Sequence, residues 1–75
     1  MTDENMIEVL RKKVNSFHKA NLPVHIPLKK NWFYNGYILE ESFDFFIIDD
    51  FKEGRMAVFY IEIIDVELFK RDGEK

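Results

Sequence analysis

The stretch from residue 24 to residue 50, VHIPLKKNWFYNGYILEESFDFFIIDD, decides the fold. Apolar and polar side chains alternate from Val24 to Leu28, which is the period of a strand with one buried face. A short polar link follows, and a second alternating run occupies Trp32 to Glu41. A third run, from Phe43 to Phe51, is apolar on both faces until its acidic end. Closely spaced strand patterns with short links predict an antiparallel meander.

An amphipathic helix is expected before the meander. Ile7, Leu10, Val14 and Phe17 recur at helical spacing and form a stripe about one face wide. We therefore expect a helix over about residues 3–20 that packs on the sheet through this stripe.

Two further strand patterns follow the meander. Gly54 supplies the positive φ that a tight hairpin needs. A fourth strand is expected over Met56–Ile61, a short break at Glu62–Ile63 and a fifth strand over Ile64–Phe69. Because Gly36 interrupts the long second strand, we expect a bulge or a sharp bend there, and a long strand bent at a glycine is how a small sheet curls into a barrel.

The sequence therefore predicts one domain over residues 1–75 with a mainly β fold. Its parts are the N-terminal helix, a five-stranded, strongly bent antiparallel small barrel over about residues 23–69, and a charged, disordered tail over residues 70–75.

Composition narrows the functional classes. The chain has 75 residues, and 47% of them are hydrophobic and 16% aromatic, which favours oligomerisation because a small core cannot use so much apolar surface. A generously packed monomer is the alternative. There is no cysteine, no apolar run approaches the roughly 18 residues of a membrane span, and the N-terminus is unlike a signal peptide. We expect an intracellular, cytoplasmic protein that does not associate with membranes.

Charge is distributed unevenly along the chain. The net charge is −3, which argues against strong general affinity for nucleic acid. Between Val9 and Leu39, however, there is no acidic residue. This asymmetry is compatible with a face for a polyanion, although a simply solvated surface fits the charge pattern slightly better. The cations of this span are Arg11, Lys12, Lys13, Lys19, Lys29 and Lys30.

No catalytic chemistry is predicted. His18 and His25 lack a third ligand at a recognisable spacing, so we expect neither a metal site nor a catalytic pair. Asp49 and Asp50 precede a hairpin turn and are interpreted as a solvated strand end. The sequence predicts no cofactor and no enzyme activity.

The strand stretch resembles a known family. Val24-x-Ile26-x-Leu28-Lys29, followed by Tyr34-x-Gly36-x-Ile38, is similar to the first motif of the Sm-like (LSm) family, which includes bacterial Hfq. Asn31 stands where the family's turn glycine usually falls, and asparagine tolerates the same left-handed conformation. Without a gap, Ser42 and Phe46 occupy the family's Asp and Asn positions in the third strand. If the preceding loop is two residues longer, Asp44 takes the Asp position instead, and the sequence leaves both registers open.

The resemblance implies an Sm-like, SH3-like barrel that assembles into a hexameric or heptameric ring. In that family the fourth strand of one subunit pairs with the fifth strand of the next. The subunit interface expected from this pairing is formed by Val58, Phe59, Tyr60, Ile64, Val66 and Leu68.

The resemblance also implies binding of single-stranded, uridine-rich RNA, in RNA processing or RNA chaperoning as a ribonucleoprotein. The family's second motif brings Arg-Gly or Lys-His to the turn before the last strand, where this chain has Tyr60-Ile61. An oligomeric Sm-like scaffold that binds protein rather than RNA is therefore the alternative. The RNA-binding candidates are Arg11, Lys12, Lys13, Lys29, Lys30, Asn31, Phe43, Asp44, Phe45, Phe46, Tyr60 and Ile61.

Overall fold

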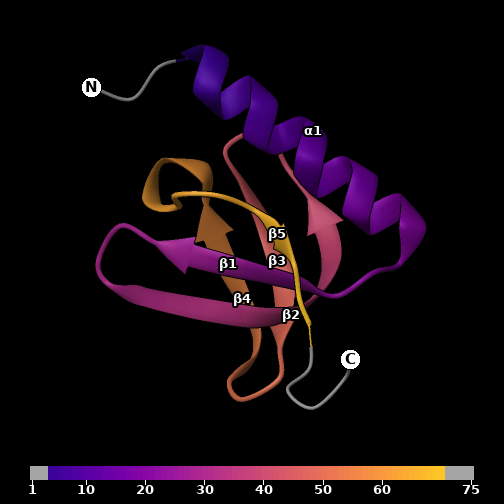
Figure 1. Ribbon diagram of the computed structural model, residues 1–75. Helices are drawn as coiled ribbons and strands as arrows, with labels where there is room; N and C mark the ends of the chain where they lie inside the picture. Colours follow the sequence, from indigo (N-terminus) through magenta and orange to yellow (C-terminus); the bar gives the residue numbers. More distant parts are fainter. Residues whose placement is uncertain (1–3, 71–75) are drawn as a thin grey trace.

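The computed structural model describes residues 4–70, and the predicted tail beyond Lys70 lies outside this range. A helix is followed by an antiparallel sheet and one short 3₁₀ turn (Figure 1). The elements are α1 (Glu4–Ala20), β1 (Val24–Leu28), β2 (Trp32–Glu41), β3 (Phe45–Asp50), β4 (Gly54–Phe59), η1 (Tyr60–Glu62) and β5 (Glu67–Leu68).

Helix α1 packs on the sheet through the predicted stripe. Leu10 and Val14 are buried, and Ile7 and Phe17 pack against the same core. The helix ends at Ala20, and Asn21 directly after it adopts a left-handed conformation with φ of 56°. Figure 1 shows α1 lying across the top of the strands, which leaves the opposite end of the sheet uncovered by helix.

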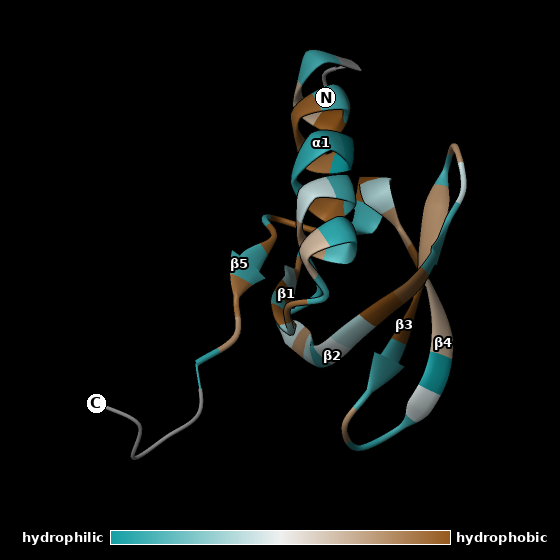
Figure 2. Ribbon diagram, turned by 90° about the vertical axis from the view of Figure 1, so that its right-hand side faces the viewer, coloured by the Kyte–Doolittle hydropathy of each residue, from teal (hydrophilic) through white to brown (hydrophobic). Residues whose placement is uncertain are grey.

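The strands form a five-stranded antiparallel sheet in the order β4-β3-β2-β1-β5. The predicted meander is confirmed, because β1, β2 and β3 pair in sequence order with Val24 opposite Gly36 and Gly36 opposite Asp50. In the described part of the chain the sheet ends at β4 on one side and at β5 on the other (Figure 2). Barrel closure thus stays a prediction.

Strand β2 approaches its neighbour very closely at Gly36. A Cβ atom placed there would collide with the backbone carbonyl of Asp49 in β3, so the position requires glycine. The pairing of β2 with β3 then shifts register between Ile38 and Glu40, as at a β-bulge. The irregularity expected in this strand therefore has two parts, a close approach and a bulge.

Several strand limits differ from the sequence prediction. Strand β3 begins at Phe45 rather than Phe43, because the Ser42 N–H donates to the Phe45 carbonyl and closes a turn. The chain leaves β4 after Phe59 and turns into η1. Strand β5 is only two residues long, although Ile64 N–H already donates to the Pro27 carbonyl of β1.

The core lies between α1 and the inner face of the sheet. It contains buried aliphatic side chains from every strand except β5, together with Phe46 and Tyr60. No helix within residues 4–70 is long and apolar enough to cross a membrane. The buried core residues are Leu10, Val14, Val24, Ile26, Leu28, Ile38, Phe46, Ile48, Val58, Tyr60, Ile63 and Val66.

Candidate nucleic-acid interface

A groove of about 230 Å³ lies between α1, the β2–β3 link and η1, and we call it the helix-side groove. It forms because η1 turns the chain toward the helix at the end of β4, while the Ser42 turn carries the β2–β3 link to the same place. The backbone N–H of Tyr60 donates to the Asp44 carbonyl at 3.0 Å and joins the two segments. The lining residues are Ile7, Arg11, Phe43, Asp44, Phe59, Tyr60 and Ile61.

Arg11 is the cation among these lining residues. Its guanidinium carbon lies 4.1 Å from the ring centre of Phe43 and 5.8 Å from that of Tyr60, within the range of a cation–π contact. Its Nε donates to the Phe43 carbonyl at 2.9 Å, and its Nη1 donates to Glu8 Oε1 at 2.8 Å. These contacts fix the guanidinium over the aromatic rings.

The walls of the groove are exposed and apolar. Phe43 is 75% exposed and Ile61 is 58% exposed, both far more than a core side chain. Arg11 occupies part of the Phe43 surface, and so large an exposed fraction leaves room for a second planar group against the ring. A flat aromatic ligand with an anionic substituent suits this pairing of an aromatic ring with a cation.

Tyr60 forms the floor. Its side chain is only 2% exposed, and its ring centre lies 5.4 Å from that of Phe46. Burial raises the pKa of the Tyr60 phenol to about 12, Glu41 adds to the increase, and Arg11 opposes it. The phenol therefore stays neutral at physiological pH and remains a hydrogen-bond donor.

The structure divides the predicted RNA-binding residues among several places. Arg11, Phe43, Asp44, Tyr60 and Ile61 line the helix-side groove. Lys29, Lys30 and Asn31 lie in the β1–β2 turn, where Asn31 has the left-handed φ of 63° that the motif comparison suggested.

The remaining candidates do not line the helix-side groove. Phe46 is fully buried, and Phe45 packs against Phe59 with ring centres 5.3 Å apart. Lys13 Nζ donates to Asp65 Oδ1 at 2.8 Å, and this bond connects α1 to the segment before β5. Lys12 is exposed on the helix. Of the three consecutive helix cations, only Arg11 therefore lines the groove.

The predicted interface residues also separate into two sets. Phe59, Ile64 and Leu68 are exposed at or beside the edge strands β4 and β5. Val58, Tyr60 and Val66 are buried in the core of their own chain, so their side chains hold η1 and the edge strands in place.

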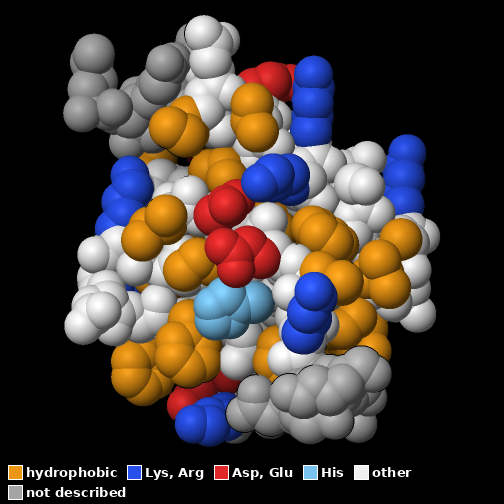
Figure 3. Space-filling view, in the orientation of Figure 1, with side chains coloured by type: hydrophobic (Ala, Val, Ile, Leu, Met, Phe, Trp, Pro, Cys, Tyr) orange, Lys and Arg blue, Asp and Glu red, His pale blue; other side chains and the backbone are white. Residues whose placement is uncertain are grey.

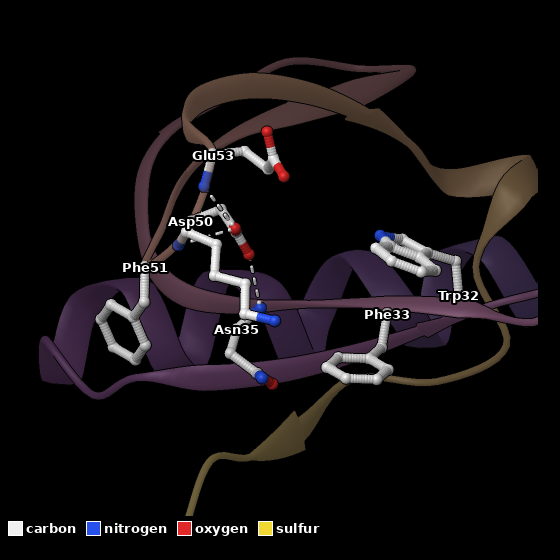
Figure 4. Close-up of a pocket in the computed structure, with 7 residues that line it drawn as sticks. Trp32, Phe33, Asn35, Asp50, Phe51 and Glu53 are labelled. Atoms are coloured by element: carbon white, nitrogen blue, oxygen red, sulfur yellow. Dashed lines mark hydrogen bonds between the residues drawn. The ribbon is translucent and has the colours of Figure 1, made fainter.

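A second hollow, of about 150 Å³, lies where β2 begins and the β3–β4 turn approaches it (Figure 4). Sequence reasoning missed it because it combines residues that are distant in sequence. Asp50, expected on a solvated strand end, is 7% exposed and accepts hydrogen bonds from three backbone N–H groups. The signal in the sequence was the acid directly before the turn, since aspartate often binds backbone N–H groups there. The lining residues are Trp32, Phe33, Asn35, Asp50, Phe51, Lys52 and Glu53.

No group of three or more potential metal ligands occurs within residues 4–70. No protein-family model matches the chain, and no curated protein sequence matches it.

Proposed function

We propose that this chain is a divergent Sm-like subunit that assembles edge to edge into a ring and binds single-stranded RNA in the helix-side groove. The observation that carries the RNA part is the fixed Arg11 guanidinium over the exposed Phe43 ring. The family's second motif has a cation at the turn where this chain has Tyr60-Ile61. In this proposal, Arg11 of the helix supplies the positive charge instead. Uridine-rich RNA is the class that the family resemblance implies.

The ring part of the proposal rests on the order of the strands. A helix followed by an antiparallel sheet with β4 and β5 at its two edges is compatible with the Sm-like fold. Unpaired edges invite pairing with another chain. Pairing of β4 with β5 of the next copy would satisfy both edges, continue the sheet from copy to copy around the ring and cover Phe59, Ile64 and Leu68.

The test is a titration of labelled oligouridine, with oligoadenosine for comparison, at two salt concentrations. We expect binding that weakens with salt, because phosphate contacts release counterions. Phe43→Leu keeps the apolar contact and removes the aromatic face, so it should weaken binding by at least about fivefold, because one stacked base contributes ~1–3 kcal/mol. Arg11→Gln should weaken binding and lower the salt slope by about one.

Lys12→Gln is the matched control, because it removes the same charge from the adjacent position on the helix. It should change affinity much less than Arg11→Gln does. Equal effects of the two variants would mean that Arg11 acts only through general charge. Binding that is unaffected by both Phe43→Leu and Arg11→Gln would remove the groove from the proposal.

One set of observations favours the alternative scaffold function. Glu8 pairs with Arg11, and Asp44 lines the same groove, so these three side chains together carry a formal charge of −1. An apolar groove without net positive charge also fits a protein side chain. Absence of binding to both oligonucleotides, by a chain that still assembles, would favour this scaffold.

A further inference from the structure

The middle of β2 contains the one asparagine–glycine pair of the chain, Asn35-Gly36. In such a pair the backbone nitrogen of the glycine attacks the side-chain amide carbon of the asparagine, because glycine has no side chain to obstruct the approach. The glycine nitrogen loses its proton, the bond from that carbon to the amide nitrogen breaks, and ammonia leaves. Water then opens the resulting succinimide ring at either carbonyl, which produces aspartate or isoaspartate. The reaction needs no reagent other than water.

The folded sheet opposes the first step through the backbone. Attack requires rotation about the bond between the Cα and the carbonyl carbon of Asn35, because an extended strand holds the next nitrogen away from the side chain. The Asn35 N–H donates to Asp50 Oδ1 at 2.8 Å, and the Asn35 carbonyl accepts the Phe51 N–H at 2.8 Å. Gly36 is paired with Val24 of β1 on one side and with Asp50 of β3 on the other. The rotation would therefore break the pairing of β2 with its neighbours.

The Asn35 side chain is held as well. Its Oδ1 lies 2.6 Å from Nδ1 of His25, the residue opposite it in β1. An amide oxygen only accepts hydrogen bonds, so the proton of this bond belongs to the histidine. Figure 4 shows Asn35 projecting from the same side of β2 as Phe33, and Figure 3 shows a histidine side chain at the surface in front of β1. Asn35 is only half-buried, so geometry rather than exclusion of water protects it.

These contacts join strands that are distant in sequence, so they exist only while the sheet is intact. We propose that Asn35-Gly36 is a deamidation site that the folded sheet keeps unreactive and that reacts once β2 separates from β1 and β3. Such separation occurs by local as well as by global unfolding. The inference is independent of RNA binding and of ring assembly, because it concerns only the pairing of β2 within one chain.

The two products differ in whether the sheet can accept them. Isoaspartate adds one atom to the main chain at position 35, between the bonds to Asp50 and Phe51 and beside the close approach of Gly36 to Asp49. Strand β2 then cannot keep both of its pairing registers. Aspartate leaves the main chain unchanged and places a carboxylate where the amide accepted from His25. Chains that open for long enough are thus lost through isoaspartate, which makes unfolding irreversible.

Incubation of the full chain at mildly alkaline pH, in buffer and in concentrated urea, tests the site. Peptide mapping by mass spectrometry measures the conversion of each asparagine to the acid. In urea Asn35 should react before the other asparagines, because each of those precedes a larger residue. In buffer Asn35 should react at least about tenfold more slowly than in urea, since a paired strand is open in only a small fraction of the molecules. The comparison residues are Asn5, Asn15, Asn21 and Asn31.

Two variants separate the chemistry from the protection. Gly36→Ala, measured in urea where the fold plays no part, should slow the reaction severalfold because its methyl group obstructs the attack. Asp50→Ala removes the acceptor of the Asn35 N–H, so it should raise the rate in buffer and leave the rate in urea unchanged. Asp49→Ala is the matched control, because it removes the adjacent, exposed acid and should change neither rate. Circular dichroism verifies which variants are folded in buffer, and the wild-type comparison decides even if Asp50→Ala is unfolded.

Chains that have reacted in urea and are then returned to buffer test the consequence. Gel filtration separates refolded from misfolded chains, and enzymatic methyl labelling detects isoaspartate. We expect aspartate at position 35 in the refolded fraction and isoaspartate only in the misfolded one. Asn35→Asp carries the aspartate product from the start and should fold as the wild type does.

Three results would overturn the proposal. Equal rates at Asn35 in buffer and in urea would mean that the fold gives no protection. A rate in urea no higher than that of the other asparagines would mean that the pair is not a reactive site. Isoaspartate in the refolded fraction would mean that β2 accepts the longer main chain.

Discussion

Two neighbouring acids differ sharply in what they do. Asp49 and Asp50 look alike in the sequence, but Asp49 is exposed and Asp50 is buried. The Asp50 carboxylate accepts N–H groups from Asn35, Lys52 and Glu53 at 2.8–3.0 Å. A single side chain thereby closes the β3–β4 turn and attaches it to β2.

Removing the Asp50 carboxylate should destabilise the fold. Asp50→Ala leaves three backbone donors without their acceptor, and we expect a loss of about 2–4 kcal/mol in the free energy of unfolding. Urea denaturation measures it. Asp49→Ala serves as the control and should change stability by less than about 0.5 kcal/mol. Similar losses for the two variants would show that the Asp50 bonds contribute little.

Gly36 is required by close approach rather than by its backbone angles. Gly36→Ala would push a methyl group into the Asp49 carbonyl, and because backbone cannot move aside cheaply we expect a loss of about 3 kcal/mol or an insoluble chain. Gly54→Ala is a useful comparison, since Gly54 has open space around it and a φ of 84°. It should cost about 1 kcal/mol through strain alone. Denaturation midpoints would contradict this account if Gly54→Ala were the more damaging change.

Helix α1 is attached to the rest of the chain by polar contacts on both flanks. On one flank Lys13 bonds Asp65, whose Oδ1 also accepts the N–H of Val66 at 2.7 Å. On the other flank His18 Nδ1 lies 2.7 Å from Glu41 Oε2, at the end of β2. These contacts set the angle of the helix, and therefore the position of Arg11 over Phe43, more specifically than the apolar stripe alone could.

The Lys13–Asp65 attachment should depend on pH. The hydrogen bond from Lys13 lowers the pKa of Asp65 below its ordinary 3.8, and the N–H of Val66 acts in the same direction. A carboxyl with a lowered folded-state pKa stabilises the fold fully above its unfolded pKa, and this contribution is lost as pH falls through the folded value. Because both side chains are more than a third exposed, we expect at most about 1 kcal/mol.

Thermal unfolding from neutral pH down to acid pH tests this dependence. At neutral pH, Lys13→Met should lower the melting temperature slightly. The difference from wild type should shrink as the pH falls below about 4, the ordinary pKa of aspartate in the unfolded chain, and should be lost as it falls further through the lowered pKa of folded Asp65. Lys12→Met is the control at the neighbouring exposed position. A Lys13→Met difference that stays constant across the range would exclude Asp65 as its partner in stability.

At the scale of the whole molecule, the sheet ends in two unequal edges. Strand β4 is six residues long and presents the exposed Phe59 at its end, whereas β5 is two residues long and presents Leu68. Unequal edges favour head-to-tail pairing between copies, which closes into a ring when the rotation allows it.

The edge contacts should determine the mass in dilute solution. Light scattering should give several times 9.1 kDa for the wild type. Phe59→Lys and Leu68→Lys place a charge at either edge and should each reduce the unit to one chain. Met6→Lys serves as the control, because Met6 is 57% exposed on α1, and it should leave the unit intact. A wild-type unit of 9.1 kDa at all concentrations would contradict ring assembly.

The sequence alone determined the helix, the meander and the left-handed turn at Asn31. These features follow from local rules, namely the spacing of apolar side chains and the φ that a residue tolerates. The early end of β4 at Phe59 could not be predicted in this way. Residues from Tyr60 onward are as apolar as a strand, and the contact of Tyr60 with Asp44, which turns the chain, comes from a distant segment.

Only the tertiary structure decided which residues share a site. Arg11 and Phe43 are 32 positions apart, and Asn35 and Asp50 are 15 apart, so no sequence spacing connects them. Folding brings them together because the helix docks beside η1 and the β3–β4 turn folds back onto β2. Side chains that were equivalent in the sequence, such as Arg11 and Lys13 or Asp49 and Asp50, consequently have different partners. The physical reason is that hydrogen bonds and ring contacts depend on distance in space, whereas periodicity reports only which face of its own element a residue occupies.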